Sequence, residues 1–444
     1  MKPFSSQSRR EFLGASALLT AGLSLGAYGA ARRISENEKL NIGIIGAGGR
    51  GWDNLQGVKS ENIVALCDVD DERAAQAHKA YPNAKRYKDF RKMLEQEKSL
   101  DAVTVSTPDH SHAIAAITAM RAGKHVYCEK PLAHSIYEVR QMAEVARETG
   151  VVTQMGQQGH AMEGTRRAVE VFRSGAIGDV TELHVWTDRP AGWWPQGEDR
   201  PKETPPVPST LDWDLWLGPA PYRPYHPIYV PFKWRGRWDF GTGAIGDMAV
   251  HCMDTAYWAL DLGVPTSAEV VASDKKTDDC PPLWSIIELY YPARGKMPPV
   301  KMIFYDGKKL PPAELFHGEK IEDNGSLMVG TKGSLYCRTW HGGQNAADMF
   351  LLLPTKQFIE YQPPSPTLPR TPEHHIEFIR ACKGGPKTES NFHYASQLVE
   401  GLLVGYLAQR TGKRIEWDAK NMKAKGLAEA DKFIHPQFRE GWTI

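Results

Sequence analysis

The chain has 444 residues, more than one ordinary domain holds, so two or three domains are expected. Its 54 Lys and Arg residues balance 53 Asp and Glu residues, whereas a nucleic-acid-binding chain carries a basic surplus. Composition therefore argues against a nucleic-acid or polyanion partner, and any charged site must be local.

Residues 1–31 differ in composition from the remainder of the chain. The pair Arg9-Arg10 is followed by Phe12 and Leu13, and then by an apolar run up to Ala31. This pattern predicts a twin-arginine (Tat) signal peptide that is cleaved near its end. A single membrane anchor is the alternative, because about 18 apolar residues is the lower limit for spanning a bilayer. The signal predicts contact with the Tat export machinery, a periplasmic or otherwise exported protein, and no membrane attachment after cleavage.

Export would place six cysteines in an oxidising compartment. Cys67 and Cys128 end apolar strand-like runs, and Cys252 lies in a helical run, so these three are interpreted as small buried hydrophobes. No disulfide framework is expected, and no metal site is predicted.

A glycine-rich turn follows the first predicted strand, residues 39–45. The run from Gly46 to Gly51, with Gly49 and Arg50 inside it, satisfies G-x-G-x-x-G at Gly46, Gly48 and Gly51. Such glycines permit a tight turn, close backbone approach to a pyrophosphate and close packing of the next helix, whose N-terminus adds N–H groups. A glycine-rich turn without a ligand is the alternative interpretation of this pattern alone.

An acidic residue stands where a dinucleotide site needs one. The second predicted strand, residues 62–67, ends at Asp68, where the acid that binds the adenosine ribose hydroxyls is expected. A carboxylate there would repel a 2′-phosphate, which favours NAD over NADP, although the nearby Arg73 leaves the choice open.

Two more predicted strands end in polar residues. Residues 100–106 lead into Thr107, Pro108, His110 and His112, and residues 125–128 lead into Glu129-Lys130-Pro131. Proline restricts the preceding residue to extended geometry, so the Lys130 ammonium is held in one direction. Helices are predicted at 72–81, 89–97, 113–122 and 135–149. Alternating strands and helices predict a doubly wound parallel sheet at 38–150, with its ligand beyond the carboxyl ends of the strands.

Residues 151–371 are predicted to form a second, α+β domain. A strand begins at 151, a helix covers 165–174, and a strand covers 180–187. Further strands at 268–273, 284–291, 300–305, 326–331 and 334–338 indicate an open, mainly antiparallel sheet. The Pro-rich stretch 362–372 is a linker, and helices at 373–382 and 391–410, within 372–444, are expected to pack back on the first domain.

An aromatic insertion occupies 189–238. Its many Pro, Trp and Tyr residues argue against both a helix and disorder. It is interpreted as a cover packed over the sheet, as an aromatic wall for a sugar-like ring, or as both. After it, Asp247 and His251 are four residues apart and share one face of a predicted helix.

Taken together, these residues resemble the Gfo/Idh/MocA oxidoreductases, the family of glucose-fructose oxidoreductase and inositol dehydrogenase. The resemblance runs from about residue 40 to 416 and rests on the glycine turn, the Thr107 to His112 segment, Glu129-Lys130-Pro131, and Asp247 with His251. It implies a Rossmann domain, a substrate domain with an open sheet, NAD or NADP, and a small sugar or cyclitol substrate. It also implies that Lys130, Asp247 and His251 face the nicotinamide, and that a homo-oligomer forms through the open sheet.

Oxidation of a secondary alcohol needs a base as well as a hydride acceptor. His251 is predicted to be the base, Asp247 to orient it or bind a neighbouring hydroxyl, and Lys130 to stabilise the forming alkoxide. A plain ion pair of Lys130 with Glu129 or Asp101 is the alternative. The cofactor is expected to be bound or supported by Thr107, Pro108, His110, His112 and Glu129.

Three functions remain open at this point. The first is an exported NAD-dependent carbohydrate oxidoreductase. Because a periplasm offers no pool of free NAD, its cofactor is expected to travel inside the folded protein. The second is a glycosidase that uses bound NAD transiently, as some exported family members do, by oxidation, elimination, hydration and reduction. The third is an inactive sugar-binding protein that kept the fold.

Overall fold

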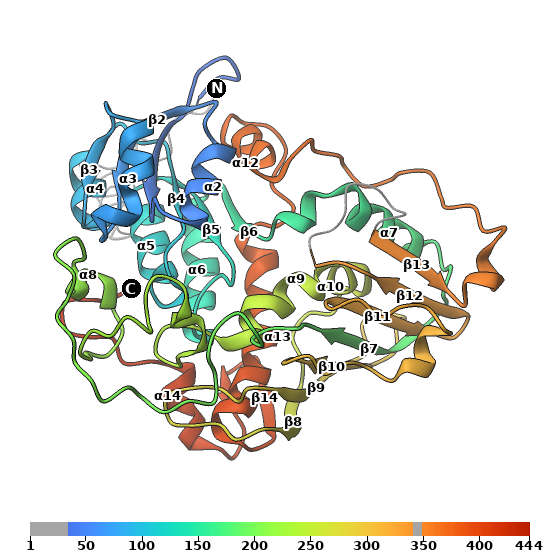
Figure 1. Ribbon diagram of the computed structural model, residues 1–444. Helices are drawn as coiled ribbons and strands as arrows, with labels where there is room; N and C mark the ends of the chain where they lie inside the picture. The colour runs from blue at the N-terminus through green and yellow to red at the C-terminus, as the bar shows by residue number, and fades with distance from the viewer. Residues whose placement is uncertain (1–33, 341–348) are drawn as a thin grey trace, which may run out of the picture.

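The computed structural model describes residues 34–340 and 349–444, which form two β-sheets with helices packed around and between them (Figure 1). The predicted signal peptide lies outside the described residues. Within the described residues, no helix combines the length and the apolar character that crossing a membrane requires. All six cysteines are buried and carry free thiols.

The first sheet has six parallel strands in the order β3-β2-β1-β4-β5-β6. Its central strands are apolar because helices cover both faces, as the sequence predicted. The strands are β1 (Asn41–Ile45), β2 (Asn62–Cys67), β3 (Lys85–Tyr87), β4 (Ala102–Val105), β5 (His125–Glu129) and β6 (Thr153–Gly156). The helices are α2 (Arg50–Gly57), α3 (Asp71–Ala80), α4 (Phe90–Gln96), α5 (Asp109–Arg121) and α6 (Ile136–Thr149).

Two strands of this sheet differ from expectation. Strand β3 was not predicted, because three polar residues at a sheet edge leave no apolar pattern. Strand β6 was expected to begin the second domain at residue 151. It instead pairs in parallel with β5 and forms the other edge of the first sheet.

Helix α5 begins at Asp109, four residues before the predicted start at 113. Pro108 occupies the N-cap position, where its missing N–H is no loss to the helix. His110 and His112 therefore lie in the first turn of a buried helix and not in a loop, which decides where their side chains go.

The second sheet has nine strands in the order β13-β12-β11-β7-β10-β9-β8-β14-β15. Its pairs are antiparallel except β7 with β10, so the prediction of a mainly antiparallel sheet is confirmed. Strands β13 to β15 are short and were not predicted. The strands are β7 (Val180–Trp186), β8 (Ser267–Ser273), β9 (Ser285–Tyr291), β10 (Val300–Tyr305), β11 (Gly325–Gly330), β12 (Gly333–Cys337), β13 (Phe350–Leu353), β14 (Ile415–Asp418) and β15 (Lys423–Ala424).

Helices of the second half pack around this sheet and back on the first domain. Helix α13 is buried along most of its length and packs against α6 of the first domain and β8 of the second (Figure 1). From α12, His375 Nε2 lies 3.0 Å from Asn54 Oδ1 of α2. These helices are α7 (Glu163–Arg173), α9 (Val250–Cys252), α10 (Asp254–Leu260), α12 (His374–Cys382), α13 (Phe392–Thr411) and α14 (Asp431–Ile434).

The aromatic insertion covers one end of the first sheet. Contrary to expectation it contains helical turns, α8 (Trp213–Leu217) and a 3-10 helix, η2 (Lys233–Gly236). Asp212 N donates to Val69 O at 2.9 Å, and Asp71 N donates to Thr210 O at 3.1 Å, so backbone hydrogen bonds join the insertion to the segment after β2. A cluster of buried aromatic rings holds the insertion together.

Candidate active site

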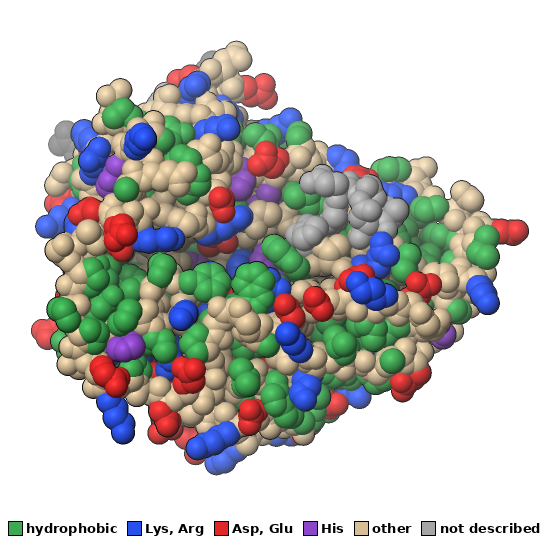
Figure 2. Space-filling view, in the orientation of Figure 1, with side chains coloured by type: hydrophobic (Ala, Val, Ile, Leu, Met, Phe, Trp, Pro, Cys, Tyr) green, Lys and Arg blue, Asp and Glu red, His purple; other side chains and the backbone are tan. Residues whose placement is uncertain are grey.

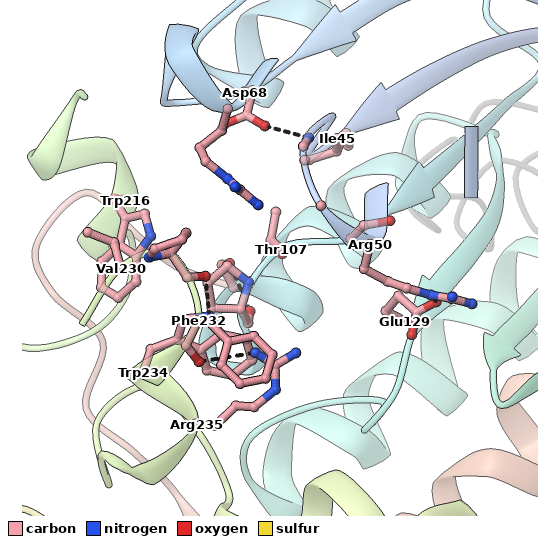
Figure 3. Close-up of a pocket in the computed structure, with 18 of the residues that line it drawn as sticks. Ile45, Arg50, Asp68, Thr107, Glu129, Trp216, Val230, Phe232, Trp234 and Arg235 are labelled. Carbon is pink, nitrogen blue, oxygen red and sulfur yellow. Dashed lines mark hydrogen bonds and ion pairs between the residues drawn. The ribbon is translucent and has the colours of Figure 1, made fainter. Parts of the chain in front are cut away.

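A cavity of about 440 Å³ lies between the carboxyl ends of the first sheet and the aromatic insertion. Figure 3 shows Ile45, Asp68 and Glu129 of the sheet on one side of this space and Trp216, Phe232 and Trp234 of the insertion on the other. Figure 2 shows hydrophobic side chains gathered along the boundary between the upper and lower parts of the molecule. Ligands of doubly wound sheets bind at such a position.

The glycine loop forms one wall and has the close packing that a dinucleotide turn needs. Gly46 has φ +79°, and a Cβ atom there would lie 2.6 Å from the Ser106 carbonyl oxygen. A Cβ at Gly51 would lie only 1.7 Å from the carbonyl oxygen of Gly46, and Gly51 itself does not line the cavity. Gly51 therefore allows α2 to approach β1, while Gly46, Gly48, Gly49 and Arg50 face the cavity.

Asp68 lies beside this loop, at the end of β2. Its Oδ2 accepts hydrogen bonds from the N–H groups of Ala47 at 2.8 Å and Gly48 at 3.1 Å. Burial raises the pKa of Asp68 despite these donors. The structure thus places the predicted ribose-binding acid in the cavity wall and gives it a second task, which is to hold the glycine loop.

Glu129 is buried at the end of β5 and binds Arg50. Arg50 Nε and Asn54 Nδ2 each donate to Glu129 Oε1 at 3.0 Å, as does Gln158 Nε2. Figure 3 shows Arg50 beside Glu129. Burial acts to raise the pKa of Glu129, but Arg50 and Asn54 outweigh it and bring the pKa down to about 2. Glu129 is therefore an anchor that joins β5 to α2.

The Lys130 ammonium is paired with Asp247. Within the described residues it forms no ion pair with Glu129, whose side chain instead accepts from the Lys130 backbone N–H at 3.3 Å. Lys130 Nζ donates to Asp247 Oδ1 and to the Asp247 carbonyl oxygen, both at 2.8 Å. Arg235 Nε donates to the same Oδ1 at 3.0 Å. Although burial opposes ionisation, Lys130 and Arg235 hold the pKa of Asp247 well below its usual range. Asp247 is therefore a carboxylate held between two cations.

His251 lines the same cavity one helical turn further along. A π-helical turn, Ile245–Ala249, precedes it, and π-turns are frequent at functional sites. Burial and then the charge of Lys130 lower the pKa of His251 to about 3. No hydrogen bond between Asp247 and His251 is found, so the expectation that Asp247 orients this ring is not met in the described part of the chain. The neutral His251 ring instead contacts Trp340, at 5.3 Å between ring centroids.

His110 and His112 do not line the cavity. His110 Nε2 lies 3.0 Å from Trp216 O of the insertion, and its ring contacts those of Trp216 and Phe240. His112 lies between two strand-end segments, with Nδ1 2.8 Å from Pro131 O and Nε2 2.7 Å from Thr107 O. The prediction that these two histidines contact the cofactor is therefore corrected, because both are buried against backbone carbonyl groups. Thr107 and Pro108 do line the cavity.

Aromatic rings form the wall opposite the sheet. Trp193 and Phe232 stay 47% and 39% exposed at the cavity, whereas Trp213 is buried in the aromatic cluster. Arg189 stacks 3.9 Å from the centre of Trp193. The insertion is therefore a packed cover, as one interpretation predicted, and its inner rings line the cavity. Its role as a wall for a sugar-like ring stays a prediction.

The C-terminal tail also reaches the cavity, beside the dinucleotide end. Trp442 is 5% exposed and lines it, and the Arg91 guanidinium of α4 lies 4.0 Å over the Trp442 ring. The tail is fastened to the insertion by Arg439, whose Nε donates to Gly218 O at 3.0 Å.

Sequence reasoning missed three contributors to this site. Arg235 belongs to an irregular segment without a motif, Gln158 follows a strand that was assigned to the other domain, and Trp442 lies at the end of the tail. Asp109, the first residue of α5, directly follows the cavity-lining Pro108. No sequence pattern indicated that its buried carboxylate accepts a hydrogen bond from Thr242 Oγ1 at 2.9 Å. Among the described residues, no group of three or more His, Cys, Asp or Glu side chains is placed to hold a metal ion.

Fold and site together define a two-domain dinucleotide-binding protein whose second domain supplies polar groups to the cofactor cavity. The model of the oxidoreductase family with an NAD-binding Rossmann fold, GFO_IDH_MocA, matches residues 40–157. The model of that family's C-terminal alpha/beta domain matches residues 186–444. The chain belongs to the Gfo/Idh/MocA oxidoreductase family, and its first domain is an NAD-binding Rossmann domain.

Curated relatives match in part of their length. Inositol 2-dehydrogenase of Salmonella typhimurium (strain LT2) is 30% identical over 151 residues, which is 33% of this chain and 45% of that protein. Levoglucosan dehydrogenase of Pseudarthrobacter phenanthrenivorans is 24% identical over 235 residues, which is 49% of this chain and 50% of that protein. The chain thus spans about half the length of the curated relatives it matches.

Solved structures share the fold across most of the chain. The WlbA dehydrogenase of Bordetella pertussis, in complex with NADH and UDP-GlcNAcA, superposes with a TM-score of 0.60 at 18% identity, covering 86% of this chain and 99% of that one. The aldose-aldose oxidoreductase of Caulobacter crescentus, complexed with glycerol, gives 0.55 at 17% identity, covering 86% and 100%.

Proposed function

We propose that this protein is an exported NAD-dependent oxidoreductase that acts on a secondary alcohol of a small carbohydrate or cyclitol and keeps its cofactor bound. One observation carries the proposal: Lys130, Asp247 and His251 line the same cavity as the glycine loop, from which they are far apart in sequence. Partial matches to inositol and levoglucosan dehydrogenases support the substrate class. The exposed rings of Trp193 and Phe232 offer flat apolar surfaces for the C–H faces of a sugar.

The residues present fit NAD. Gly46 and Gly48 line the cavity in a turn too tightly packed for a Cβ atom, which is the backbone that lies against a pyrophosphate. Gly51 lets α2 pack close to β1, and the α2 N-terminus adds backbone N–H groups. Asp68 would hold the ribose hydroxyls and repel the extra phosphate of NADP. The Arg73 guanidinium lies close to Gly49. Its positive charge would weaken the preference for NAD over NADP. Bound NAD supplies a hydride acceptor.

Lys130 has the donors to hold the reacting oxygen. An ammonium has three N–H groups, and among the described residues two of them are used by Asp247. The third is free to donate to a substrate oxygen in the cavity. Because Asp247 and Arg235 fix the Lys130 side chain beforehand, the alkoxide meets a donor that needs no reorganisation.

His251 is the proton acceptor in this proposal. Its pKa of about 3 means that the ring is neutral, with a free lone pair, at any physiological pH. It is a weak base in the empty site. Lys130 therefore has to lower the basicity of the alkoxide for the proton to transfer, which makes the two residues act as a pair.

Two segments enclose the dinucleotide end and support cofactor retention. The insertion is joined by backbone hydrogen bonds to the end of β2, and the C-terminal tail places Trp442 against α4. A cofactor under both segments leaves only when they move. A retained cofactor is what export of an already folded protein requires.

We also propose that a homo-oligomer forms through the uncovered parts of the second sheet.

A panel of myo-inositol, glucose and p-nitrophenyl glycosides, incubated with purified protein without added NAD, tests the proposal. Oxidation is expected to appear as fluorescence of protein-bound reduced nicotinamide, and Lys130→Met is expected to slow its appearance about a hundred- to a thousandfold. Release of nitrophenol, with solvent deuterium entering the sugar, would establish the glycosidase instead. Sugar binding without fluorescence or nitrophenol in any member would favour the inactive binding protein.

A further inference from the structure

A second histidine lies buried behind His251, on the side away from the main cavity. His160 is 1% exposed and belongs to a short 3-10 turn after β6, Gln158–Ala161. Its Nδ1 lies 2.8 Å from Oδ2 of Asp254, which is 4% exposed. His160 also stacks on Trp258, with 4.2 Å between ring centroids. The ring is therefore fixed in position and orientation.

The contacts of Asp254 assign the protons of this pair. Its other oxygen, Oδ1, accepts from Gln157 Nε2 and from the Tyr394 hydroxyl, both at 2.6 Å. Burial raises the pKa of Tyr394 well above its ordinary value, so Tyr394 stays a donor. Asp254 is thus a carboxylate, and His160 must carry its proton on Nδ1 to donate to it. Its Nε2 is left as a bare lone pair.

That lone pair has no partner among the described residues, although the atom is buried. Gln157 Oε1 is in the same condition. Both residues line a second, small cavity of about 10 Å³, and His251 lines it as well as the main cavity. A volume of roughly 10 to 15 Å³ holds one water molecule when two to four polar groups surround it. The small cavity meets that requirement with His251, His160 and Gln157.

We propose that His160, held by Asp254, receives through one water molecule the proton that His251 takes from the substrate hydroxyl. The inference rests on the proposed function. His160 touches no substrate, so it is a positioning and relay residue for His251.

The proton balance is simple. The substrate O–H bond breaks, its proton binds the His251 ring, and its electron pair becomes the second bond of the new C=O group. The C–H bond on the same carbon breaks, and its hydrogen leaves with both electrons as hydride to bound NAD. His251 passes a proton to the water, and the water gives one of its own to His160 Nε2. His160 becomes an imidazolium, and the reverse path returns the proton when the substrate is reduced.

Electrostatics give this transfer its direction. His251 faces Lys130, whose charge disfavours a second positive charge nearby. His160 instead has the Asp254 carboxylate at 2.8 Å, which stabilises an imidazolium. A sugar and a cofactor in the main cavity would also separate His251 from solvent on that side, since it is only 8% exposed without them.

Nitrogen NMR of the full-length protein with ¹⁵N-labelled histidine tests the relay without any activity. His160→Gln assigns the signals. The expected spectrum has His160 protonated on Nδ1 and bare on Nε2. A proton on Nε2 would overturn the proposal, because that nitrogen could then accept nothing from the cavity. The NMR measurement needs no turnover, so it can be made even if no panel sugar is oxidised. Failure of the relay can therefore be told apart from failure of the proposed function.

Single-turnover kinetics with the panel sugar that wild type oxidises fastest provide the second measurement, because the retained NAD is reduced once per chain. Here kcat is the saturating rate constant of that reduction, and KM is the sugar concentration that gives half of it. His160→Gln is expected to lower kcat about ten- to a hundredfold with KM and cofactor content unchanged, and to enlarge the solvent deuterium isotope effect on kcat. Asp254→Asn should act in the same direction and serves if the first variant does not fold.

The matched control is His184→Gln. His184 is equally buried and carboxylate-paired, with Nε2 2.8 Å from Glu182 Oε1, but it lies on β7 away from both cavities. It should leave kcat and the isotope effect unchanged. If His160→Gln behaves like His184→Gln in both quantities, the relay is wrong and His160 only supports the fold.

Discussion

The Nζ atom of Lys130 lies 2.8 Å from Oδ1 of Asp247, although 117 residues separate them. Lys130 follows the last residue of β5 in the first sheet, and Asp247 lies in the π-helical turn after the insertion. This ion pair joins the NAD-binding domain to the second half of the chain at the cavity itself. The proposed chemistry depends on this ion pair, because it fixes the Lys130 ammonium that is to bind the reacting oxygen.

Lys130→Met should remove the donor that stabilises the alkoxide. Removal of one such donor typically reduces turnover about a hundred- to a thousandfold, and we expect a fall of that size in kcat/KM with the panel sugar, while the bound cofactor is retained. Lys124→Met is the control, because Lys124 Nζ donates to Leu100 O at 2.6 Å in the same domain but far from the cavity lining. A kcat/KM of the Lys130→Met variant within tenfold of the wild-type value would contradict the role assigned to Lys130.

The pH dependence of kcat/KM reports on His251. A base acts only when unprotonated, and the folded-state pKa of His251 is lowered from 6.5 to about 3. Activity should therefore not fall as the pH drops through 6.5, and kcat/KM should stay flat between about pH 5 and 7. In Lys130→Met the loss of positive charge should move the acid limb upward. A one-proton loss of wild-type activity centred near 6.5 would mean that another histidine is the base.

Trp442→Ala should loosen the cofactor. The ring packs against Arg91 and closes the cavity near Phe90, so its removal opens a path from the dinucleotide end. We expect NAD(H) to be lost during extended dialysis of the variant but kept by wild type, as measured by cofactor content per chain. Tyr222→Ala is the control, since Tyr222 is 71% exposed and lines no part of the cavity. If wild type and both variants keep the same amount of NAD(H) per chain, the C-terminal tail does not hold the cofactor in place.

Asp306→Asn should change the pH dependence of stability. Burial raises the pKa of Asp306 from 3.8 to about 8, and the side chain accepts from Ser285 Oγ at 3.0 Å. Between those values the folded state binds a proton that the unfolded state has lost, so stability falls as the pH rises. Each pKa unit corresponds to about 1.4 kcal/mol. Urea unfolding midpoints at about pH 5 and pH 8 should differ less in the variant than in wild type. An unchanged difference would show that Asp306 is ionised in the fold.

The sequence predicted the parts of the site that follow regular patterns. Gly46 and Asp68 lie at the cavity because β1 and β2 are apolar runs that end just before them. Asp247 and His251 were placed on one helical face, and both reach the cavity. The second sheet was recognised from its longer strands, whereas β3 and β15 are too short and polar to be seen.

Other features depend on contacts that no local pattern encodes. Arg235 reaches Asp247 because the insertion folds over the sheet, and the path of that segment is set by its buried rings. His110 and His112 were misassigned because α5 begins four residues early, which turns both rings into the interior. The pairing of Lys130 with Asp247 follows from the meeting of two domains.

Native mass spectrometry of the full-length protein, purified without added nucleotide, tests most directly the claim that the cavity holds NAD as a resident redox cofactor. We expect one NAD or NADH per chain. On mixing with the panel sugar that wild type oxidises, bound NAD should gain the mass of one hydride without being released. A chain that carries no nucleotide and takes up none when NAD is supplied would contradict it.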